Sequence, residues 1–282
     1  MEKQCEQVEK YGLHGLIHLA MILFPKAKIN LGLQVVSKRD DGFHNIESVF
    51  YPIDLTDILE VVPSSNEGIE LQISGLLPDG DVSDNLVSKA YRAVASQREI
   101  PGVKVHLHKH IPMGAGLGGG SSDAASMVKT LNLLFDLNMS DSLMRDIVSP
   151  LGSDCAFFIE SIPAFASGRG EVLEPLNLDL SNYHIGLIHP QVHVSTKDAY
   201  AGISVKPTVF DLKKLAQLPI DQWKDHVKND FEDSVFKKYP TIEKAKKHLY
   251  DLGAVYASMS GSGSTCFGLF EKQFDDSEIH WV

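Results

Sequence analysis

The chain has 282 residues, of which 43% are hydrophobic, which is enough to build the core of one large or two medium-sized domains. Its formal net charge of −11 at pH 7 excludes a general nucleic-acid binder, because such a protein needs a basic surface. The three cysteines lie far apart in the sequence, which excludes a disulfide framework and is typical of the reducing cytoplasm.

Residues 1–20 differ in composition from the rest of the chain. The first ten contain three glutamates and two lysines, so the segment lacks the basic start of a signal peptide. The apolar stretch 13–24 is short and interrupted by two histidines, so it is no membrane span either. We expect a short amphipathic extension, or sequence upstream of a start at Met21, and no membrane association.

The stretch 26–35 alternates between apolar and polar residues, which predicts a strand. Lys28 and Asn30 share its polar face and therefore project together. The alternation alone favours a solvated edge face over a functional one. A turn with Asp41-Gly42 at its tip follows, then strands at 46–50, 58–62 and 69–73 and a helix at 84–97.

A glycine-rich stretch, residues 112–122, connects a predicted strand at 103–107 to a helix that continues past residue 131. Five glycines in this stretch leave backbone N–H groups uncovered, and a helix start with such amides binds anions, most often phosphate. No Gly-Lys-Ser/Thr follows, so the stretch is not a P-loop. A dinucleotide-binding loop should open a domain, and a flexible linker should not be flanked directly by a strand and a helix.

Three alternating histidines, His106, His108 and His110, lie on one face of the strand before this stretch. Such a row could bind a metal ion. We favour a solvated strand face, because no Cys, Asp or Glu joins the histidines nearby.

Ser140 is expected to cap a helix that ends at Pro150. Asp154 then follows a glycine turn and precedes an apolar run, where its carboxylate could be partly buried or could cap a helix. A change in composition around residues 162–170 places a domain boundary near residue 165.

The second half of the sequence predicts a strand at 185–189 and helices at 211–217, 221–228 and 241–252, the last ending at Gly253. Two further strands, 254–259 and 265–270, enclose Ser260-Gly-Ser-Gly-Ser264. Taken alone, this second glycine stretch would be an ordinary hairpin.

Three motifs, in this order, resemble those of the GHMP kinases. They are Pro25-Lys-Ala-Lys28-Ile-Asn30-Leu, Pro112-Met-Gly-Ala-Gly-Leu-Gly-Gly-Gly-Ser-Ser122 and Ser260-Gly-Ser-Gly-Ser264. Two further motifs, Asp41-Gly-Phe-His44 and Leu151-Gly-Ser-Asp154, are most similar to the branch of that family that acts on cytidine-diphosphate methylerythritol. The resemblance covers roughly residues 21–270.

The resemblance implies an α+β fold with two GHMP kinase domains, residues 21–165 and 166–282, after the extension 1–20, and an active site in the cleft between them. It implies a small-molecule kinase that uses ATP and Mg²⁺ to phosphorylate the 2-hydroxyl of that substrate in the non-mevalonate route to isoprenoids. A kinase for another alcohol, such as homoserine or mevalonate, and a catalytically inactive ligand-binding relative are the alternatives. We expect small-molecule substrates as the binding partners, and a monomer or weak homodimer.

The resemblance also assigns site residues. The catalytic pair falls on Asp154, as proton acceptor, and Lys28, which would keep that carboxylate ionised and offset developing charge. The cytosine is implied to lie between Phe43 and Tyr200, with His44 bonded to the base and Asn30 beside the reacting end. The family usually has tyrosine where this chain has Phe43, so the ring is kept and one hydroxyl is lost. The implied ATP-binding residues are Asn85 and Lys109 near the adenine, and Pro112, Gly114, Gly116, Leu117, Gly118, Gly119, Gly120, Ser121 and Ser122 in the loop, Ser122 also being a possible ligand on the Mg²⁺ side.

Overall fold

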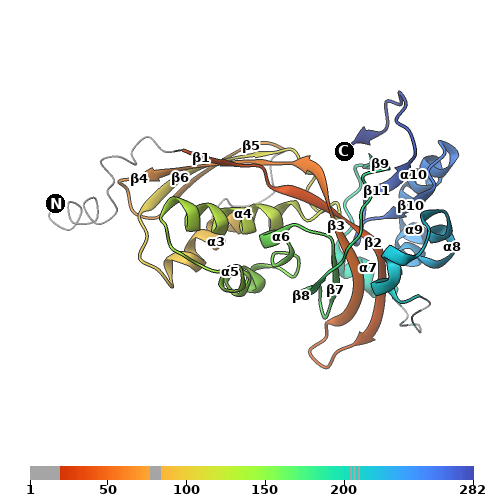
Figure 1. The fold of residues 1–282 in the computed structure, drawn as a ribbon, viewed down its shortest axis with the longest axis horizontal. Coiled ribbons are helices and arrows are strands. Elements are labelled where there is room, and N and C mark those ends of the chain that lie inside the picture. The colour runs from red at the N-terminus through yellow and green to blue at the C-terminus, as the bar shows by residue number, and fades with distance from the viewer. Residues whose placement is uncertain (1–19, 77–83, 204, 206–207, 209) are drawn as a thin grey trace. The chain divides into compact units, whose positions relative to one another are not determined.

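The computed structural model describes residues 20–76, 84–203, 205, 208 and 210–282, which form an α+β fold (Figure 1). The chain divides into two compact units. The first contains the described residues up to Lys26, Leu55–Pro112 and Gly119–Glu160, and the second contains Ala27–Asp54, Met113–Gly118 and Ser161–Val282. The glycine-rich stretch therefore contributes to both units. Of the predicted extension 1–20, all but Ala20 lies outside the described residues, and the boundary near residue 165 stays a prediction.

The first unit contains a four-stranded sheet with the order β1-β4-β6-β5, and its helices cover one face of that sheet (Figure 1). Strands β5 and β6 are parallel and the other neighbours are antiparallel. The alternation predicted for 103–107 is confirmed, since Val103, Val105 and Leu107 are all buried. The elements are β1 (Met21–Leu23), β4 (Ile58–Ser64), β5 (Ile69–Gly75), β6 (Gly102–Lys109), α3 (Leu86–Ala95), α4 (Gly119–Leu134), α5 (Asp141–Val148), a 3₁₀ turn (Ser149–Leu151) and α6 (Phe157–Glu160).

Two helices of this unit start at side chains that cap them. The Asn85 side-chain oxygen accepts a hydrogen bond from the Val87 N–H (2.9 Å) at the start of α3. The Ser140 hydroxyl accepts one from the Leu143 N–H (3.3 Å) at the start of α5, which confirms the predicted cap. Each bond satisfies one of the N–H groups that have no partner within the helix.

The second unit contains two four-stranded sheets, with the orders β2-β3-β7-β8 and β10-β11-β9-β12. Helix α10 packs on the second sheet, and residues from α9, α10, β10 and β11 share one hydrophobic core. The strands are β2 (Lys26–Lys38), β3 (His44–Thr56), β7 (Ala164–Ser167), β8 (Val172–Pro175), β9 (His184–Ile188), β10 (Tyr256–Met259), β11 (Cys266–Phe270) and β12 (His280–Trp281). The helices are α7 (Thr196–Ala201), α8 (Trp223–His226), α9 (Glu232–Lys238), α10 (Pro240–Asp251) and the 3₁₀ segments Leu212–Gln217 and Ile220–Gln222.

Strand β2 is buried on both faces, so the solvated edge face that its alternation favours is wrong. The polar face is covered by the segment before α9. Gly32 has φ of +74°, and a Cβ there would come within 2.9 Å of the side chains of Leu212 and Val227. Gln34 donates a hydrogen bond to the Phe210 carbonyl (2.9 Å) on the same face. Lys28 and Asn30 therefore lie in a protein interior and not in water.

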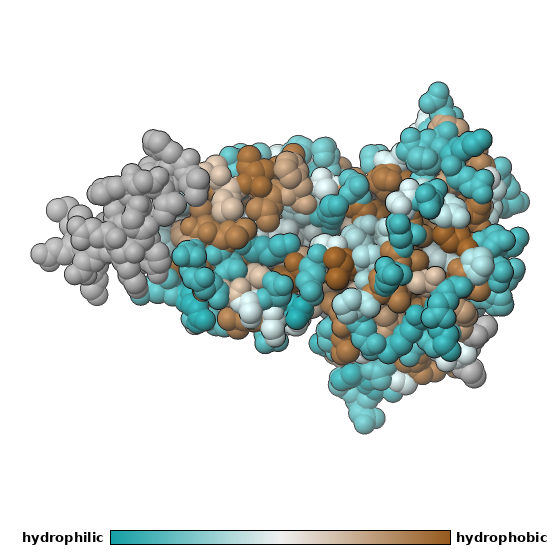
Figure 2. Space-filling view, in the orientation of Figure 1, coloured by the Kyte–Doolittle hydropathy of each residue, from teal (hydrophilic) through white to brown (hydrophobic). Residues whose placement is uncertain are grey.

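Much of the visible surface is hydrophilic, with hydrophobic residues scattered among the polar ones (Figure 2). Among the described residues, no helix combines the length and the hydrophobicity that crossing a lipid bilayer requires.

Candidate active site

Lys28 and Asn30 project together from β2, as the alternation predicts, and they form the centre of a buried polar network. The Lys28 ammonium donates hydrogen bonds to the Asn30 side-chain oxygen (2.5 Å) and the Gly116 carbonyl (3.2 Å). The Asn30 amide donates to the Ser48 hydroxyl (2.9 Å), which donates to the Gly32 carbonyl (2.6 Å). This network fixes the rotamers of Lys28 and Asn30, and it joins the ammonium group to the glycine-rich stretch.

The two glycine stretches pack against each other, backbone to backbone. We call residues 113–118 the first glycine loop and residues 260–264 the second. The Ser260 hydroxyl donates to the Gly116 carbonyl (2.8 Å), and the Thr265 N–H donates to the Ala115 carbonyl (3.2 Å). Gly116 has φ of +80°, and a Cβ there would lie 1.9 Å from the Ser260 carbonyl oxygen. Only glycine allows this approach. The second glycine loop therefore connects β10 to β11 and is also packed against the first loop.

Helix α4 begins at Gly119, directly after the first glycine loop. Its first turn contains Gly120, Ser121 and Ser122, so N–H groups without helical partners and the positive end of the helix dipole coincide there. This arrangement can bind a phosphate group. The predicted strand–loop–helix order is confirmed, with Lys109 ending β6 and Gly119 starting α4.

Asp154 lies half-buried in the turn between Gly152 and helix α6. This turn lies against the start of α4: a Cβ at Gly152 would be 3.5 Å from the Ser121 hydroxyl and 3.2 Å from the Cys155 sulfur. Burial raises the pKa of the Cys155 thiol to about 11, although a hydrogen bond with Ser121 lowers it. The thiol therefore stays protonated. The proximity of Gly152 to Ser121 shows that the first unit brings the turn with Asp154 next to the start of α4.

A buried ionic triad lies beneath the start of α4. The Lys109 ammonium forms ion pairs with Asp57 and with Asp123 (2.7 Å for the second), and all three side chains are at least 97% buried. The second Asp57 oxygen accepts hydrogen bonds from the N–H groups of His110 (2.6 Å) and Ile111 (2.9 Å). The triad thus fixes the chain before the glycine-rich stretch and the helix after it. Sequence reasoning did not find this triad, because Asp57 is 52 residues from Lys109 and no local pattern connects them.

Burial raises the pKa of Asp123 to about 7, the Lys109 ammonium opposes this shift, and the Asp57 charge adds to it. Within the described part of the chain, Asp123 Oδ1 is buried and has no hydrogen-bond partner. An acceptor in that state favours the neutral carboxyl.

The aromatic residues expected around the cytosine lie in two places in the second unit. His44 stacks on Tyr200, with ring centroids 4.7 Å apart and an interplanar angle of 18°. Phe43 is 54% exposed, and the Arg169 guanidinium lies 5.0 Å from the centre of its ring. The structure therefore brings His44 and Tyr200 together and leaves the Phe43 ring accessible on one side.

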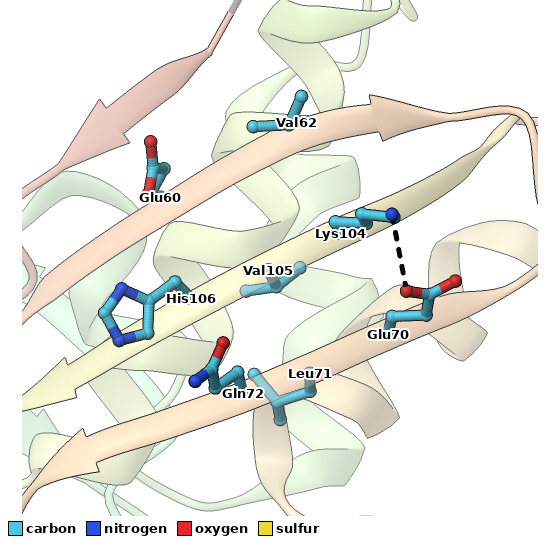
Figure 3. Close-up of a pocket in the computed structure, with 8 residues that line it drawn as sticks. All are labelled: Glu60, Val62, Glu70, Leu71, Gln72, Lys104, Val105 and His106. Carbon is cyan, nitrogen blue, oxygen red and sulfur yellow. Dashed lines mark ion pairs between the residues drawn. The ribbon is translucent and has the colours of Figure 1, made fainter.

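A depression of about 330 Å³ lies on the open face of the sheet in the first unit, and the residues that line it include none of the predicted site residues (Figure 3). Lys104 and Glu70 form an ion pair across it (3.8 Å). His106, which lines the depression, and His108 each share a hydrogen bond with the Ser74 hydroxyl (2.8 Å in both cases). The histidines thus contact a hydroxyl group on the neighbouring strand.

The structure brings together three groups of the predicted residues, each within one unit. They are Lys28 and Asn30 with Gly116, His44 with Tyr200, and the turn of Asp154 with Ser121. Lys28 belongs to the second unit and Asp154 to the first, and their catalytic pairing stays a prediction. No cluster of three His, Cys, Asp or Glu that could hold a metal ion occurs among the residues the structure describes.

Sequence comparison gives the class of the protein. Residues 85–161 match the GHMP kinases N terminal domain, and residues 212–280 match the GHMP kinases C terminal. The chain belongs to the GHMP kinase family, and it is a kinase that uses ATP and acts on an alcohol.

Within this family, the chain is most usefully compared with two relatives of high identity. The chain is 49% identical over 255 residues to 4-diphosphocytidyl-2-C-methyl-D-erythritol kinase of Bacteroides fragilis, covering 90% of this chain and 93% of the relative. It is 48% identical over 263 residues to the protein of the same name from Bacteroides thetaiotaomicron, with 93% and 96% of the two chains covered.

Solved structures of kinases also match the fold of this chain. A crystal structure of 4-(cytidine 5′-diphospho)-2C-methyl-D-erythritol kinase matches with a TM-score of 0.73 and 33% identity, covering 88% of this chain and 90% of that one. Homoserine kinase from Cytophaga hutchinsonii matches with a TM-score of 0.64 and 20% identity, covering 88% and 86%, and so shares the fold.

Proposed function

We propose that this chain transfers the γ-phosphoryl group of ATP to the 2-hydroxyl of 4-diphosphocytidyl-2-C-methyl-D-erythritol, a step in isoprenoid precursor biosynthesis. The observation that carries the proposal is the identity of 48–49% with proteins named for this reaction, over at least 90% of each chain. The stacked pair of His44 and Tyr200 supports it, because a flat base can be held by aromatic rings and an aliphatic acid such as mevalonate cannot.

Asp154 is the proposed general base, which accepts the proton of the attacking hydroxyl or orients that hydroxyl. Its half-buried position next to the start of α4 suits this role, because the helix start is where the phosphates are expected. Lys28 is proposed to stabilise the negative charge that develops on the transferred phosphoryl group. Its buried ammonium is held in one orientation by Asn30 and Gly116, which lowers the cost of reorganisation during the reaction.

The proposed triphosphate site consists of Pro112, Gly114, Gly116, Leu117, Gly118, Gly119, Gly120, Ser121 and Ser122. Its anion-binding groups are backbone amides and the dipole of α4, which suits a chain with a net charge of −11. Asn85 and Lys109 are proposed to lie near the adenine. Because its ammonium is already bound by two buried carboxylates, Lys109 is expected to shape this region and not to bind phosphate directly.

Mg²⁺ is a further part of the proposal. The donor set fits an ion carried by the triphosphate, since Mg²⁺ is usually bound by one or two protein groups together with substrate phosphates. The buried hydroxyl of Ser122, in the first turn of α4, is the proposed protein group on its side. When bound, Mg²⁺ would neutralise charge on the phosphates. The proposal also includes the cytoplasm as the location and a monomer or weak homodimer as the oligomeric state. It further includes a boundary between the two family domains near residue 165.

Phosphoryl transfer from ATP tests this function directly. The purified chain is incubated with ATP, Mg²⁺ and, in parallel, the cytidylyl substrate, mevalonate or homoserine, and the products are identified by ³¹P NMR and mass. We expect a new phosphomonoester on the cytidylyl substrate alone. Phosphorylation of another alcohol would favour a different GHMP kinase activity, and binding of the cytidylyl substrate without any product would favour an inactive relative.

A further inference from the structure

The segment Asn229–Glu232 follows α8 and ends at the first residue of α9. It contacts three parts of the candidate site, and we call it the brace. Its backbone runs along β2: the Leu33 N–H donates to the Lys228 carbonyl (2.9 Å), and the Asp230 N–H donates to the Leu33 carbonyl (2.8 Å). The Asp230 carboxylate also accepts a hydrogen bond from the Val35 N–H (2.7 Å). The brace is thereby fixed to the strand that carries Lys28 and Asn30.

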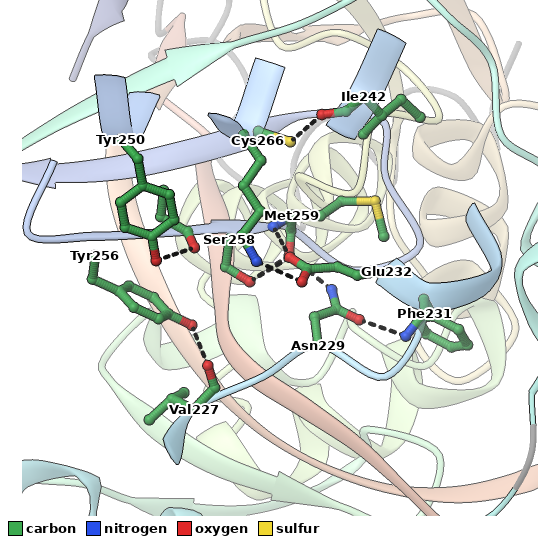
Figure 4. A network of polar contacts seen from close by, with 12 residues as sticks. Val227, Asn229, Phe231, Glu232, Ile242, Tyr250, Tyr256, Ser258, Met259 and Cys266 are labelled. Atoms are coloured by element: carbon green, nitrogen blue, oxygen red, sulfur yellow. Dashed lines mark hydrogen bonds and ion pairs between the residues drawn. The ribbon is translucent and has the colours of Figure 1, made fainter. Parts of the chain in front are cut away.

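Asn229 and Glu232 hold the chain where β10 leaves its sheet and enters the second glycine loop (Figure 4). The Asn229 amide donates to the carbonyls of Met259 (2.7 Å) and Gly261 (2.8 Å). The Glu232 carboxylate accepts from the Met259 N–H (2.9 Å) and the Ser258 hydroxyl (3.1 Å). Both backbone groups of Met259 are therefore bonded to side chains of the brace.

These bonds are strong for their kind. Asn229 is buried, and its side-chain oxygen accepts from the Phe231 N–H (3.0 Å), so the amide orientation is defined. The other Glu232 oxygen forms an ion pair with Lys246 (2.6 Å) in a partly buried position. Hydrogen bonds to a charged acceptor away from water are stronger than neutral ones.

The second glycine loop passes this constraint to the catalytic groups. The Ser260 hydroxyl, completely buried, accepts a hydrogen bond from the Asn30 N–H (3.3 Å) and donates to the Gly116 carbonyl (2.8 Å). The same carbonyl accepts from the Lys28 ammonium (3.2 Å). A shift of the second loop would therefore move the first loop and the ammonium group as well.

Phe231, the remaining brace residue, supports the aromatic pair. Its ring meets that of Tyr200 edge to face, with centroids 4.8 Å apart, and Tyr200 stacks on His44. Phe231 itself is buried in the core of the second unit. It can therefore fix the plane of the Tyr200 ring without contacting the base.

We propose that the brace is a positioning element with two separable effects: Asn229 and Glu232 position the glycine loops and Lys28, and Phe231 positions Tyr200. The assignment of these effects to ATP and to the cytidylyl substrate rests on the proposed function. Because the two sets of contacts are distinct, a change in each should alter the kinetics for a different substrate.

Two variants test this separation by steady-state kinetics with both substrates varied. Asn229→Asp replaces the donating amide by an oxygen that faces two carbonyls and keeps the acceptor for the Phe231 N–H. The variant loses both hydrogen bonds that the amide donates. We therefore expect kcat/KM for ATP to fall about tenfold or more, with KM for the cytidylyl substrate within about twofold. Phe231→Leu should show the opposite split, with the KM for the cytidylyl substrate raised and that for ATP nearly unchanged.

Tyr250→Phe is the matched control. It removes a hydrogen bond to the Ala257 carbonyl (3.2 Å) in the same strand, before the glycine loop begins. It should lower the melting temperature with no change in either KM. Glu232→Gln, which keeps an acceptor for the Met259 N–H, provides the measurement if Asn229→Asp does not fold, and it should raise the KM for ATP.

A purely structural role predicts lower melting temperatures with unchanged kinetics for folded Asn229→Asp or Glu232→Gln, and that result would overturn the proposal. Equal changes in both KM values for Phe231→Leu would also overturn it. If wild-type protein instead phosphorylates a different alcohol, the proposed function fails, and the ATP effect of the brace is still measured with that alcohol.

Discussion

Replacing Asp123 by asparagine should change how the stability of the protein depends on pH. The substitution keeps an oxygen that can accept from Lys109 and removes the carboxyl whose ionisation would place a second negative charge, besides that of Asp57, next to the ammonium. The triad carries a net charge of −1 when both carboxylates are ionised, and the variant would leave one lysine and one aspartate. We expect the variant to be folded, because the ion pair with Asp57 and its bonds to the backbone persist.

The size of the expected change in the free energy of unfolding follows from the pKa of Asp123, which burial raises from 3.8 to about 7. Between these values the native state holds a proton that the unfolded state has lost. A group of this kind contributes stability below its unfolded pKa and loses it as the pH rises through its folded pKa. The free energy of unfolding should therefore fall by about 1.4 kcal/mol for each pH unit in this window, or about 2 kcal/mol between pH 5.0 and 6.5.

Urea denaturation of both proteins across pH 5.0–8.5 measures this effect. The difference between wild type and Asp123→Asn reports the titration of Asp123 together with its interaction with Asp57, because the titrating residues outside the triad are shared. The free energy of unfolding of the variant minus that of wild type should increase by about 2 kcal/mol as the pH rises from 5.0 to 6.5. A constant difference between the two proteins, or one that changes in the opposite direction, would refute the assignment of a neutral Asp123 in the native triad.

Three further predictions concern the site. Asp154→Asn should keep the fold and lower kcat by about 10²–10⁴, and turnover near that of wild type would remove Asp154 as the base. Phe43→Ala should raise the KM for the cytidylyl substrate and leave that for ATP nearly unchanged, whereas Phe43→Tyr keeps the ring and should change neither by much; equal effects of Phe43→Ala on both substrates would contradict the base-stacking role. Gly116→Ala places a Cβ 1.9 Å from the Ser260 carbonyl oxygen, so activity should be largely lost, whereas Gly253→Ala, at φ of +98° with nothing within 4 Å, tests positive φ alone and should remain active. Kinetics of folded Gly116→Ala that match wild type would show that the loops do not need this close approach.

The sequence predicted the parts of the fold whose causes are local. Alternation placed β2 and β6, glycine and serine marked the start of α4, and Ser140 and Gly253 marked helix ends. The same alternation could not show that β2 is buried on its polar face. That burial depends on Leu212 and Val227, which are about 180 residues or more away in the sequence and pack on Gly32.

The brace and the triad could not be predicted for a related reason. Asn229 lies between two short helices, and helix α9, with seven residues, gives no clear periodicity. Asp57 follows a strand and looks like an ordinary turn residue until Lys109 comes next to it in the fold. His44 was expected to bond to the base, and its stacking on Tyr200 also depends on residues far apart in sequence.

The specificity constant is the most direct test of the central claim. The cytidylyl substrate, mevalonate and homoserine compete for limiting enzyme with saturating ATP, and the ratio of the products gives the ratio of their kcat/KM values. We predict that the cytidylyl substrate is preferred by at least about a hundredfold. A kcat/KM for either of the other alcohols that equals or exceeds that for the cytidylyl substrate would contradict the proposed function.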